Sequence, residues 1–378
     1  TREGISIFDT GTSKFQNYEH SKYDPTSLSH NSIRDITGDD AQGIWIATYA
    51  GGINYYHRNN NIFIHVKEEF GTSNTLSYNK ISCLYKDRED ILWIGTEGRG
   101  LNRYNEIQGR FRQFINSGSD KHIALDNIRS IAEADNGILW LGTIGGLSRF
   151  NKQKDKFINF IHDPADTNSL SVNQVHATLI DRNGNLWIGT NGGGLDRYVP
   201  ELNGFIHHRH SDDPSSLISN NINVLLEGAD EKLWIGTQAG LDCFDPDKNR
   251  FAEFPDISGG RRIMPSTRIV TLFEDSHGRF WVGTEGRGLL LLNRSDYSIR
   301  SFTKKDGLPN DVVNAILEDD QSNLWVSTNR GISWLSFDES LGDEETQISI
   351  RNFNESEGLQ GLQFYPGCAF KDKDGRFY

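Results

Sequence analysis

Five polar residues share one position in a repeated pattern, each one step after an aliphatic residue that opens an apolar run. They are Arg34, Arg129, His176, Asn223 and Asn314, and two further copies of the position carry Ser82 and Val270. Guanidinium, imidazole and amide groups offer directional hydrogen-bond donors, which suit a polyhydroxylated or anionic ligand. We therefore predict that the five polar residues contact such a ligand.

A second set of candidates lies in glycine-containing turns that differ from copy to copy. Function tends to reside in loops that vary over a constant scaffold. The candidates are Tyr49, Glu97, Arg99, Asn191, Glu285, Arg287 and Arg330. Solvated loop residues are an equally good interpretation. Glu97 and Glu285 are consistent with a glycosidase pair, but their separation is not set by the sequence, so polar contacts are the preferred interpretation.

Two other clusters point to structure more than to chemistry. Aspartates recur in short hairpins, at Asp87, Asp181, Asp275, Asp319 and Asp372. No copy completes the oxygen-ligand spacing of a calcium loop, so we interpret them as turn residues. The histidines of residues 207–210 have no carboxylate or cysteine beside them at a metal-site spacing. No catalytic residue, metal or cofactor is predicted.

The elements that position these residues come from a repeat. Seven tryptophans head a Trp-x-Gly-Thr-like phrase and are spaced 48, 47, 47, 47, 47 and 44 residues apart. They are Trp45, Trp93, Trp140, Trp187, Trp234, Trp281 and Trp325. Such a unit is too short to bury a core alone and must pack on its neighbours. The tryptophan, threonine and glycine of the phrase are predicted to be structural, the tryptophan packing between neighbouring units.

Each unit reads as four strands, A to D. Strand A opens twelve residues before the tryptophan, at Ile33, Ile81, Ile128, Val175, Ile222, Ile269 or Val313. A polar hairpin leads to strand B, the tryptophan phrase, and a glycine-rich turn leads to strand C. Strand D alternates aromatic and polar residues, and a longer polar connection follows. Asparagine or aspartate stands two residues before six of the seven openers and is predicted to cap that connection.

Four antiparallel strands per period of about 47 residues predict an all-β fold, a β-propeller of four-stranded blades. The chain opens and stops in mid-repeat, so we expect a fragment of a longer protein. Residues 1–17 are expected to supply strands C and D of a composite blade, and residues 363–378 its strands A and B. Seven complete repeats plus this blade predict a single propeller over 1–378 with eight blades; seven is the alternative.

Composition limits the partners. The formal net charge is −13, so no field attracts nucleic acid. No apolar run approaches the roughly 18 residues of a membrane span, so membrane contact is expected only through segments outside this sequence. The three cysteines have no paired spacing or metal motif and read as isolated apolar residues.

The recurring pattern resembles the two-component regulator propeller repeat. It is carried by Asn173, Asp181, Gly184, the phrase of residues 186–190 and the Gly-Leu-x-Arg-Tyr of residues 194–198. The resemblance covers essentially the whole chain, with Ala47 and Ser327 replacing the glycine of the phrase as departures. It implies a periplasmic ligand-sensing domain of a hybrid histidine kinase, often glycan-binding, attached to the inner membrane through later segments.

Three functions remain open at this point. The first is a non-catalytic sensor for an oligosaccharide or another polar small ligand, which signals through missing C-terminal domains. The second is a polysaccharide lyase or hydrolase, which requires acid and base groups clustered at the mouth of the propeller. The third is a protein-interaction platform with an apolar rim. A second propeller or a homodimer partner is a further expectation from the resemblance.

Overall fold

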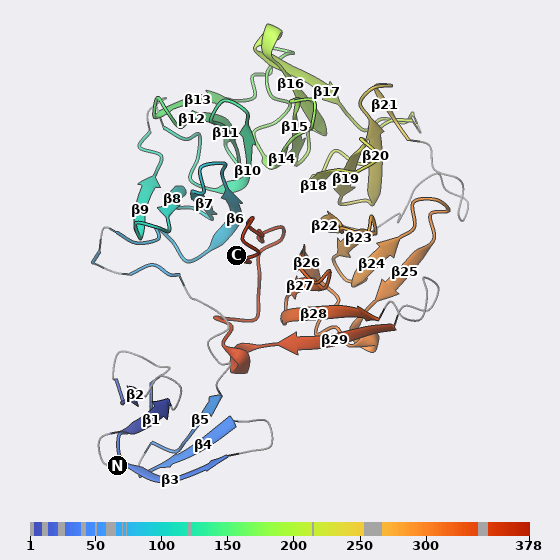
Figure 1. Ribbon diagram of the computed structural model, residues 1–378. Coiled ribbons are helices and arrows are strands. Elements are labelled where there is room, and N and C mark those ends of the chain that lie inside the picture. Colours follow the sequence, from blue (N-terminus) through green and yellow to red (C-terminus); the bar gives the residue numbers. More distant parts are fainter. Residues whose placement is uncertain are drawn as a thin grey trace. The chain divides into compact units, whose positions relative to one another are not determined.

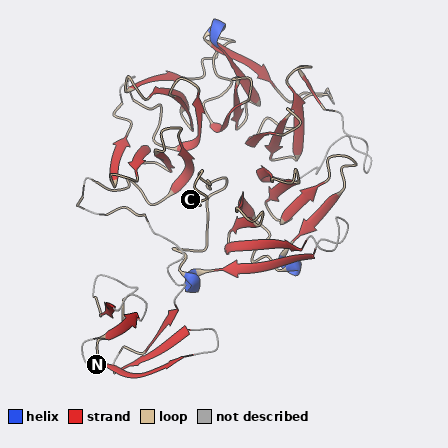
Figure 2. Ribbon diagram, viewed as in Figure 1, coloured by secondary structure: helices blue, strands red, loops and turns tan. Residues whose placement is uncertain are grey.

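A computed structural model of the chain describes residues 4–9, 14–21, 27–38, 43–49, 51–57, 66–69, 71–72, 74–118, 122–213, 215–252, 267–338 and 347–378. In this part of the chain, strands and turns predominate, with three single-turn 3-10 helices (Figure 2). The helices are η1 (Pro200–Leu202), η2 (Lys304–Asp306) and η4 (Glu355–Glu357).

The chain divides into two compact units. The first comprises Thr1–His65 with Glu355–Gln360, and the second comprises Val66–Asn354 with Gly361–Tyr378. The first unit holds a two-stranded and a three-stranded antiparallel sheet. Its strands are β1 (Ile5–Asp9) and β2 (Lys14–Tyr18), then β3 (Ile33–Gly38), β4 (Gly43–Thr48) and β5 (Ile53–His57).

The second unit holds six four-stranded antiparallel sheets among its described residues, each formed by consecutive strands (Figure 1). The first three sheets are β6 (Ile81–Lys86), β7 (Leu92–Thr96), β8 (Leu101–Asn105) and β9 (Arg110–Phe114); β10 (Ile128–Ala134), β11 (Ile138–Thr143), β12 (Gly146–Asn151) and β13 (Lys156–Phe160); and β14 (Val175–Ile180), β15 (Leu186–Thr190), β16 (Leu195–Val199) and β17 (Gly204–His208). The next three are β18 (Ile222–Glu227), β19 (Leu233–Thr237), β20 (Leu241–Asp245) and β21 (Arg250–Phe251); β22 (Ile269–Glu274), β23 (Phe280–Thr284), β24 (Leu289–Leu292) and β25 (Ile299–Phe302); and β26 (Val313–Glu318), β27 (Leu324–Thr328), β28 (Gly331–Asp338) and β29 (Gln347–Phe353).

The sheets of the second unit are arranged radially, with the A strands innermost. Each A strand contacts the A strand of the next sheet, from β6 and β10 through to β22 and β26, and these strands surround the centre in Figure 1. All seven predicted openers are the first residues of their strands. The predicted fold class, an all-β propeller of four-stranded antiparallel blades, is confirmed, and the eight sheets of the described residues match the eight repeats found by phase.

The tryptophan phrase is structural, as predicted. Trp187 is 1% exposed and packs with Phe244 of the next blade at a ring-centroid distance of 5.4 Å. A Cβ on Gly189 would lie 2.5 Å from the Cγ2 atom of Ile222, which opens the next blade, so the glycine permits the close approach of the two sheets. The hydroxyl of Thr190 donates to the carbonyl of Gly194 at 2.8 Å and closes the turn after strand B.

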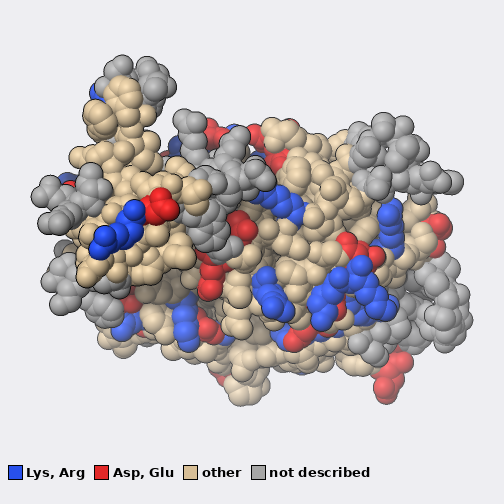
Figure 3. Space-filling view, turned by 90° about the horizontal axis from the view of Figure 1, so that it is seen from below, with Lys and Arg blue, Asp and Glu red and all other residues tan. Residues whose placement is uncertain are grey.

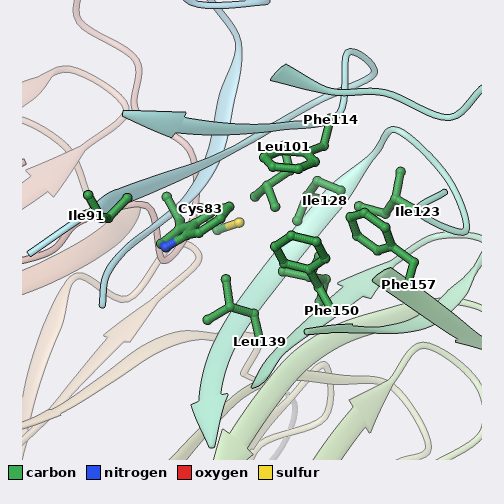
Figure 4. Packing of buried hydrophobic residues seen from close by; sticks show 11 residues of the cluster. Cys83, Ile91, Leu101, Phe114, Ile123, Ile128, Leu139, Phe150 and Phe157 are labelled. Atoms are coloured by element: carbon green, nitrogen blue, oxygen red, sulfur yellow. The ribbon is translucent and has the colours of Figure 1, made fainter. Parts of the chain in front are cut away.

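Aromatic and aliphatic side chains fill the spaces between blades. Figure 4 shows one such cluster, in which Phe114 and Leu101 of one blade meet Phe150, Phe157 and Ile128 of the next. Phe114 and Phe150 pack edge to face with ring centroids 5.1 Å apart. The core therefore lies between blades, and no repeat is stable without a neighbour.

The hairpin aspartates are turn residues, as predicted. In the hairpin between β14 and β15, Asp181 accepts backbone hydrogen bonds from Asn183 and Asn185 at 3.0 and 2.8 Å. Its second oxygen accepts a 2.8 Å hydrogen bond from the indole nitrogen of Trp187. The same carboxylate–indole bond recurs at Asp87, Asp275 and Asp319. These carboxylates therefore join each hairpin to the core tryptophan of its own blade.

A glutamate at the end of strand A links neighbouring blades. Glu227 accepts a 2.9 Å hydrogen bond from the backbone nitrogen of Arg182, in the hairpin of the preceding blade. It also forms an ion pair with the Arg182 side chain. Equivalent backbone bonds are accepted by Glu133, Glu274 and Glu318. On the side of the molecule shown in Figure 3, lysine and arginine lie among aspartate and glutamate.

The C-terminal segment lies between the first and last complete blades of the second unit. Phe377 contacts Trp325 of β27, with ring centroids 5.7 Å apart, and Phe370 contacts Tyr85 of β6 at 6.2 Å. An isolated antiparallel bridge between Lys371 and Phe377 makes the segment a short hairpin. This segment thus fills the interval between the β26–β29 and β6–β9 sheets.

The single propeller over residues 1–378 stays a prediction. Residues 363–378 belong to the second unit, whereas β1 and β2 form a separate two-stranded sheet in the first. The C-terminal hairpin makes its aromatic contacts with β6 and β27 of the second unit. The completion of one composite blade by the two end segments, and a ring of eight blades, stay predictions.

Candidate functional site

A β-bulge lies at the predicted ligand position of every A strand. The pairing of strands A and B skips one residue directly after the opener, for example between Ile128 and Ser130 in β10. The skipped residues are Arg34, Ser82, Arg129, His176, Asn223, Val270 and Asn314. A bulge leaves one residue out of the ladder and re-aims its side chain. We call the six of these residues in the second unit, from Ser82 to Asn314, the axial ring.

Some ring side chains bond to the next strand of the ring. The hydroxyl of Ser82 donates to the carbonyl of Ile128, and the amide of Asn223 donates to the carbonyl of Ile269 at 2.9 Å. Asn314, 2% exposed, donates instead to the side-chain oxygen of Asn329 at 2.8 Å. These bonds fix the side chains on the inner strands.

The turns between strands B and C bring three further predicted residues to the ring. Glu97, Asn191 and Glu285 each form an isolated antiparallel bridge with the residue directly before the opener of the next A strand. These partners are Asn127, Asn221 and Val312. Glu97 Oε1 lies 3.4 Å from Arg129 Nη2, and Glu285 Oε2 lies 2.7 Å from Arg268 Nη1. Asn191 donates to Gln174 at 2.8 Å.

The C-terminal segment supplies an aromatic residue that the sequence does not reveal. The guanidinium of Arg129 lies 5.3 Å from the ring centroid of Tyr365. The backbone nitrogen of Gly367 donates to the carbonyl of Asn314 at 2.7 Å, which holds this segment against the ring. Tyr378 has the tryptophan position of the last repeat, so Tyr365 corresponds in phase to Arg268, one residue before an opener position.

Electrostatics also bring Arg268 into this group. Burial lowers the pKa of His176 below its ordinary value, and the positive charges of Arg129 and Arg268 lower it further. His176 is therefore neutral at pH 7. The Nε of Arg129 is buried without a hydrogen-bond partner in the described part of the chain. Arg268 stands one residue before an opener, a position that the sequence argument did not consider.

The remaining predicted residues do not join this ring. Arg99 pairs with Glu68 at 3.0 Å and lines a surface pocket with Thr75 and Gln113. Arg287 donates to the hydroxyl of Thr267 at 3.0 Å.

Arg330 is exposed, and its backbone nitrogen donates to Thr328 at 3.0 Å. Arg34 and Tyr49 lie in the first unit. The guanidinium of Arg34 lies 4.5 Å from the ring centroid of Tyr49. A single ring of all twelve candidates stays a prediction, and some of the turn side chains bond to local partners.

The predicted caps before strand A are confirmed. The side-chain oxygen of Asn173 accepts from the backbone nitrogen of His162 at 2.6 Å, which ties the start of the long connection to its end. The same bond is made by Asn31, Asn79, Asp126, Asn220 and Asp311. These residues thus hold the long connection in place before strand A.

The histidines of β17 have structural partners. His207 Nδ1 lies 2.6 Å from Asp196 Oδ1, and its Nε2 lies 3.1 Å from the carbonyl oxygen of Thr167. Both partners accept hydrogen bonds, so both are satisfied only by the doubly protonated imidazolium. The hydrogen bond to Asp196 raises the pKa of His207, although burial and the charge of Arg209 oppose this.

We expect this bond pair to make stability depend on pH. Because the folded-state pKa is raised, the contribution is fully present below about pH 6.5 and is lost as pH rises through the folded pKa. In β13, Asn159 makes the equivalent bond to a carbonyl at 2.8 Å, so His207→Asn preserves that bond without a titrating group. Between pH 5 and 8, the melting temperature of the parent is expected to decline as pH rises. This decline is expected to be absent in His207→Asn. If the variant showed the same decline, the pH dependence would come from other titrating groups.

Neither a metal site nor a membrane helix is found among the described residues. No group of three or more histidine, cysteine, aspartate or glutamate side chains there is arranged to hold a metal ion. None of the helices described is long and apolar enough to cross a membrane.

Comparison with known proteins identifies the repeats. The family described as two-component regulator propeller matches residues 75–98, 122–145, 169–192, 216–239, 263–286 and 307–330. No curated protein matches the chain significantly.

Among solved structures, the extracellular domain assigned to the hybrid two-component system BT3049 of B. thetaiotaomicron is 27% identical, with a TM-score of 0.70, over 100% of this chain and 47% of that one. The extracellular domain assigned to the one-component system BT4673 of the same organism is 21% identical, with a TM-score of 0.62, over 99% of this chain and 48% of that one.

The second likeness, at this identity, shows the fold alone. This chain spans about half the length of either structure. The six matched segments cover strand A, the hairpin, strand B and the following turn of each complete blade in the second unit. The chain belongs to the two-component regulator propeller family and is similar to the extracellular domain of a hybrid two-component system.

Proposed function

We propose that this chain is a non-catalytic, ligand-sensing part of the periplasmic region of an inner-membrane two-component regulator, and that it binds an oligosaccharide at the axial ring. The observation that carries this proposal is the set of bulges. They turn Arg129, His176, Asn223 and Asn314 out of their ladders on four inner strands. A scaffold that repeats one structural position with different donors is suited to a ligand with many hydroxyl groups.

The groups around the ring match the chemistry of a sugar. Glu97 and Glu285 supply acceptors, Arg129 supplies donors, and Tyr365 adds a half-buried aromatic ring. Aromatic rings with a polar edge suit ligands that have both apolar and hydroxylated surfaces. Because the similar structures are about twice as long as this chain, signal output is assigned to parts outside it.

An interaction platform is less well supported by the ring. It would present an apolar rim, whereas the axial ring is mostly polar. A second propeller or a homodimer partner at another surface is compatible with ligand binding and remains part of the proposal. A lyase or hydrolase would leave cleaved sugar, which gives the test below a second readout.

The test is calorimetric titration of the chain with neutral and anionic oligosaccharides. Arg129→Ala and Tyr365→Ala are each expected to weaken binding by about ten-fold or more, because a polar or stacking contact to a ligand contributes roughly 1–2 kcal/mol. Arg112→Ala is the matched control, since Arg112 is also ion-paired but lies on the outer strand β9. Equal losses in all three variants, or no binding by any sugar, would overturn the proposal. Cleaved sugar would replace it with an enzyme.

A further inference from the structure

A surface pocket lies beside the long connection that leads into β6. Its volume is about 210 Å³, and all of its lining residues belong to the second unit. They include Glu68, Thr75, Leu76, Arg99, Gln113 and Ile115, none of which belongs to the axial ring. Most ligand pockets are larger, roughly 300–1,000 Å³. This pocket therefore suits a small ligand, or one residue of a longer ligand.

The connection at this pocket differs from two others by the exchange of a histidine. In the connection before β14, the ring of His162 bonds to the carbonyl of Leu170 at 2.8 Å. His210 makes the equivalent contact before β18 at 2.7 Å. Before β6, Glu68 has this position, because its backbone nitrogen donates to the cap residue Asn79 as that of His162 donates to its own cap. An ionised carboxylate cannot donate to a carbonyl, so the imidazole contact has no counterpart at Glu68.

The turn after β7 carries a second exchange. In the blade of β14–β17 the corresponding residue is Gly193, where a Cβ would lie 2.1 Å from the Oγ atom of Ser171. In the blade of β6–β9 it is Arg99, whose Nη1 lies 3.0 Å from Glu68 Oε1 and 3.4 Å from the carbonyl oxygen of Ser77. The two exchanges occur together, so a guanidinium and a carboxylate meet in the wall of the pocket.

This ion pair leaves hydrogen-bonding groups for a ligand. The side chains of Arg99 and Glu68 are 56% and 12% exposed. Among the described residues, both polar contacts of the Arg99 side chain use Nη1, so Nε and Nη2 remain as donors. The amide nitrogen of Gln113 donates to the carbonyl of Thr75 at 2.9 Å, which directs the other atom of this amide, an acceptor, elsewhere. Ile115, 43% exposed, adds an apolar wall.

We propose that this pocket is a second binding site, outside the axial ring, for a neutral hydroxylated ligand the size of one sugar residue. A sugar hydroxyl both donates and accepts, so it can bond to Arg99 and Glu68 without separating the ion pair. Because these two charges neutralise each other and Glu69 adds a negative charge to the lining, an anion is disfavoured. A few converging polar groups beside an apolar wall are typical of small-ligand sites. The inference does not depend on a ligand at the axial ring.

The experiment titrates the intact chain with three probes, which are methyl glucoside, methyl galactoside and glycine. Binding is followed through the NMR signals of the backbone amides. At least one glycoside is expected to bind and to shift the signals of Glu68, Ser77 and Arg99. Glycine is not expected to bind, because a zwitterion would have to separate the ion pair to reach both charges.

Variants of the two exchanged residues locate the site. Glu68→His introduces the residue found at this position before β14 and β18, so the variant is expected to fold and to weaken glycoside binding by about ten-fold or more. Arg99→Ala is expected to weaken it by about five-fold or more. Arg287→Ala is the matched control, because Arg287 has the same turn position in another blade and donates to Thr267. It is expected to bind as the parent does.

Three results would overturn the proposal. They are the absence of shifts with both glycosides, unchanged binding in Glu68→His, and an equal loss in Arg287→Ala. Preferential binding of glycine would replace the neutral ligand with a zwitterion and would equally contradict it. The proposed function is tested separately, since Glu68→His is expected to leave the effect of Arg129→Ala on oligosaccharide binding unchanged.

Discussion

Replacing Trp187 with alanine is expected to lower the free energy of unfolding by about 3–5 kcal/mol, the range for large buried aromatic residues. The side chain is 1% exposed and packs between two blades, against Phe244 and the ring of His208. Its removal leaves a cavity at an interface that both blades need. It also leaves one oxygen of Asp181 without its indole donor. Urea unfolding of the parent and variant measures the difference; if unfolding is irreversible, the shift in melting temperature does so.

A phenylalanine at the same position separates packing from hydrogen bonding. Trp187→Phe retains most of the ring and loses the N–H group, while Asp181 keeps its two backbone donors. We expect most of the stability lost in the alanine variant to return, with a residual loss of about 1–2 kcal/mol. A loss as large as that of alanine would place the main contribution in the Asp181–Trp187 bond. A negligible loss in both variants would contradict the role of the tryptophan as the core between blades.

The strands could be predicted because several signals agree at each repeat. The opener Val175, the phrase around Trp187 and the turn at Gly194 all recur in phase with the repeat. All three occupy the predicted positions. Alternation of apolar and polar residues, turn glycines and a fixed period each indicate the same element. The bulge after each opener could not be predicted, because the skipped residue differs in type from one blade to the next.

Part of the site has a sequence signal that the prediction did not use. Lys80, Asn127, Gln174, Asn221 and Arg268 stand one residue before their openers and vary as much as the ring residues do. The argument that selected His176, a hydrogen-bond donor at a repeated position, applies equally to Arg268. The interblade glutamates were also visible in phase, at Glu133, Glu227, Glu274 and Glu318.

Other parts of the site depend on contacts between distant segments. Tyr365 reaches Arg129 although 236 positions separate the two in the sequence (365 − 129 = 236). Equivalent repeats have equivalent surfaces, so the pattern alone does not select which blade receives the hairpin. The contacts that distinguish β6 are made by side chains specific to that blade.

Lys86 is foremost among those side chains, and its replacement by methionine is expected to cost about 3–5 kcal/mol, because removing one partner leaves buried charge unpaired. Lys86 Nζ lies 2.8 Å from Asp372 Oδ2 and 2.8 Å from Glu106 Oε2, and the lysine and aspartate side chains are 7% and 1% exposed. It also donates to the hydroxyl of Tyr378 at 3.3 Å. Four other blades carry at this position a glutamate that bonds a hairpin backbone. Here a lysine bonds the hairpin carboxylate instead, a contact that Lys152, between β12 and β13, makes with Asp87 in the preceding blade at 2.8 Å.

Two comparisons define this effect at neutral pH. Lys373, in the same C-terminal hairpin as Asp372, pairs with Asp90 of the hairpin between β6 and β7 at 2.5 Å. These two side chains are 67% and 42% exposed. Lys373→Met is therefore expected to cost less than about 1 kcal/mol. Adding Asp372→Asn to Lys86→Met removes the orphaned charge while keeping an oxygen for the backbone of Arg376. The double variant is expected to be more stable than Lys86→Met alone, and a further loss would show that the carboxylate is needed without its lysine.

The same pair predicts the response to acid. Burial alone would raise the pKa of Asp372, but hydrogen bonds from Lys86, the Arg376 backbone and Tyr378 lower it to about 2. With an unfolded-state pKa near 3.9, this contribution is fully present above about pH 4 and is lost as pH falls towards about 2. The protection of residues 370–378 against hydrogen exchange, relative to the intrinsic rate at each pH, should therefore fall over this range in the parent and already be low at pH 7 in Lys86→Met. Slow exchange in that variant would mean that the aromatic contacts of Phe370 and Phe377 hold the hairpin without the buried ion pair.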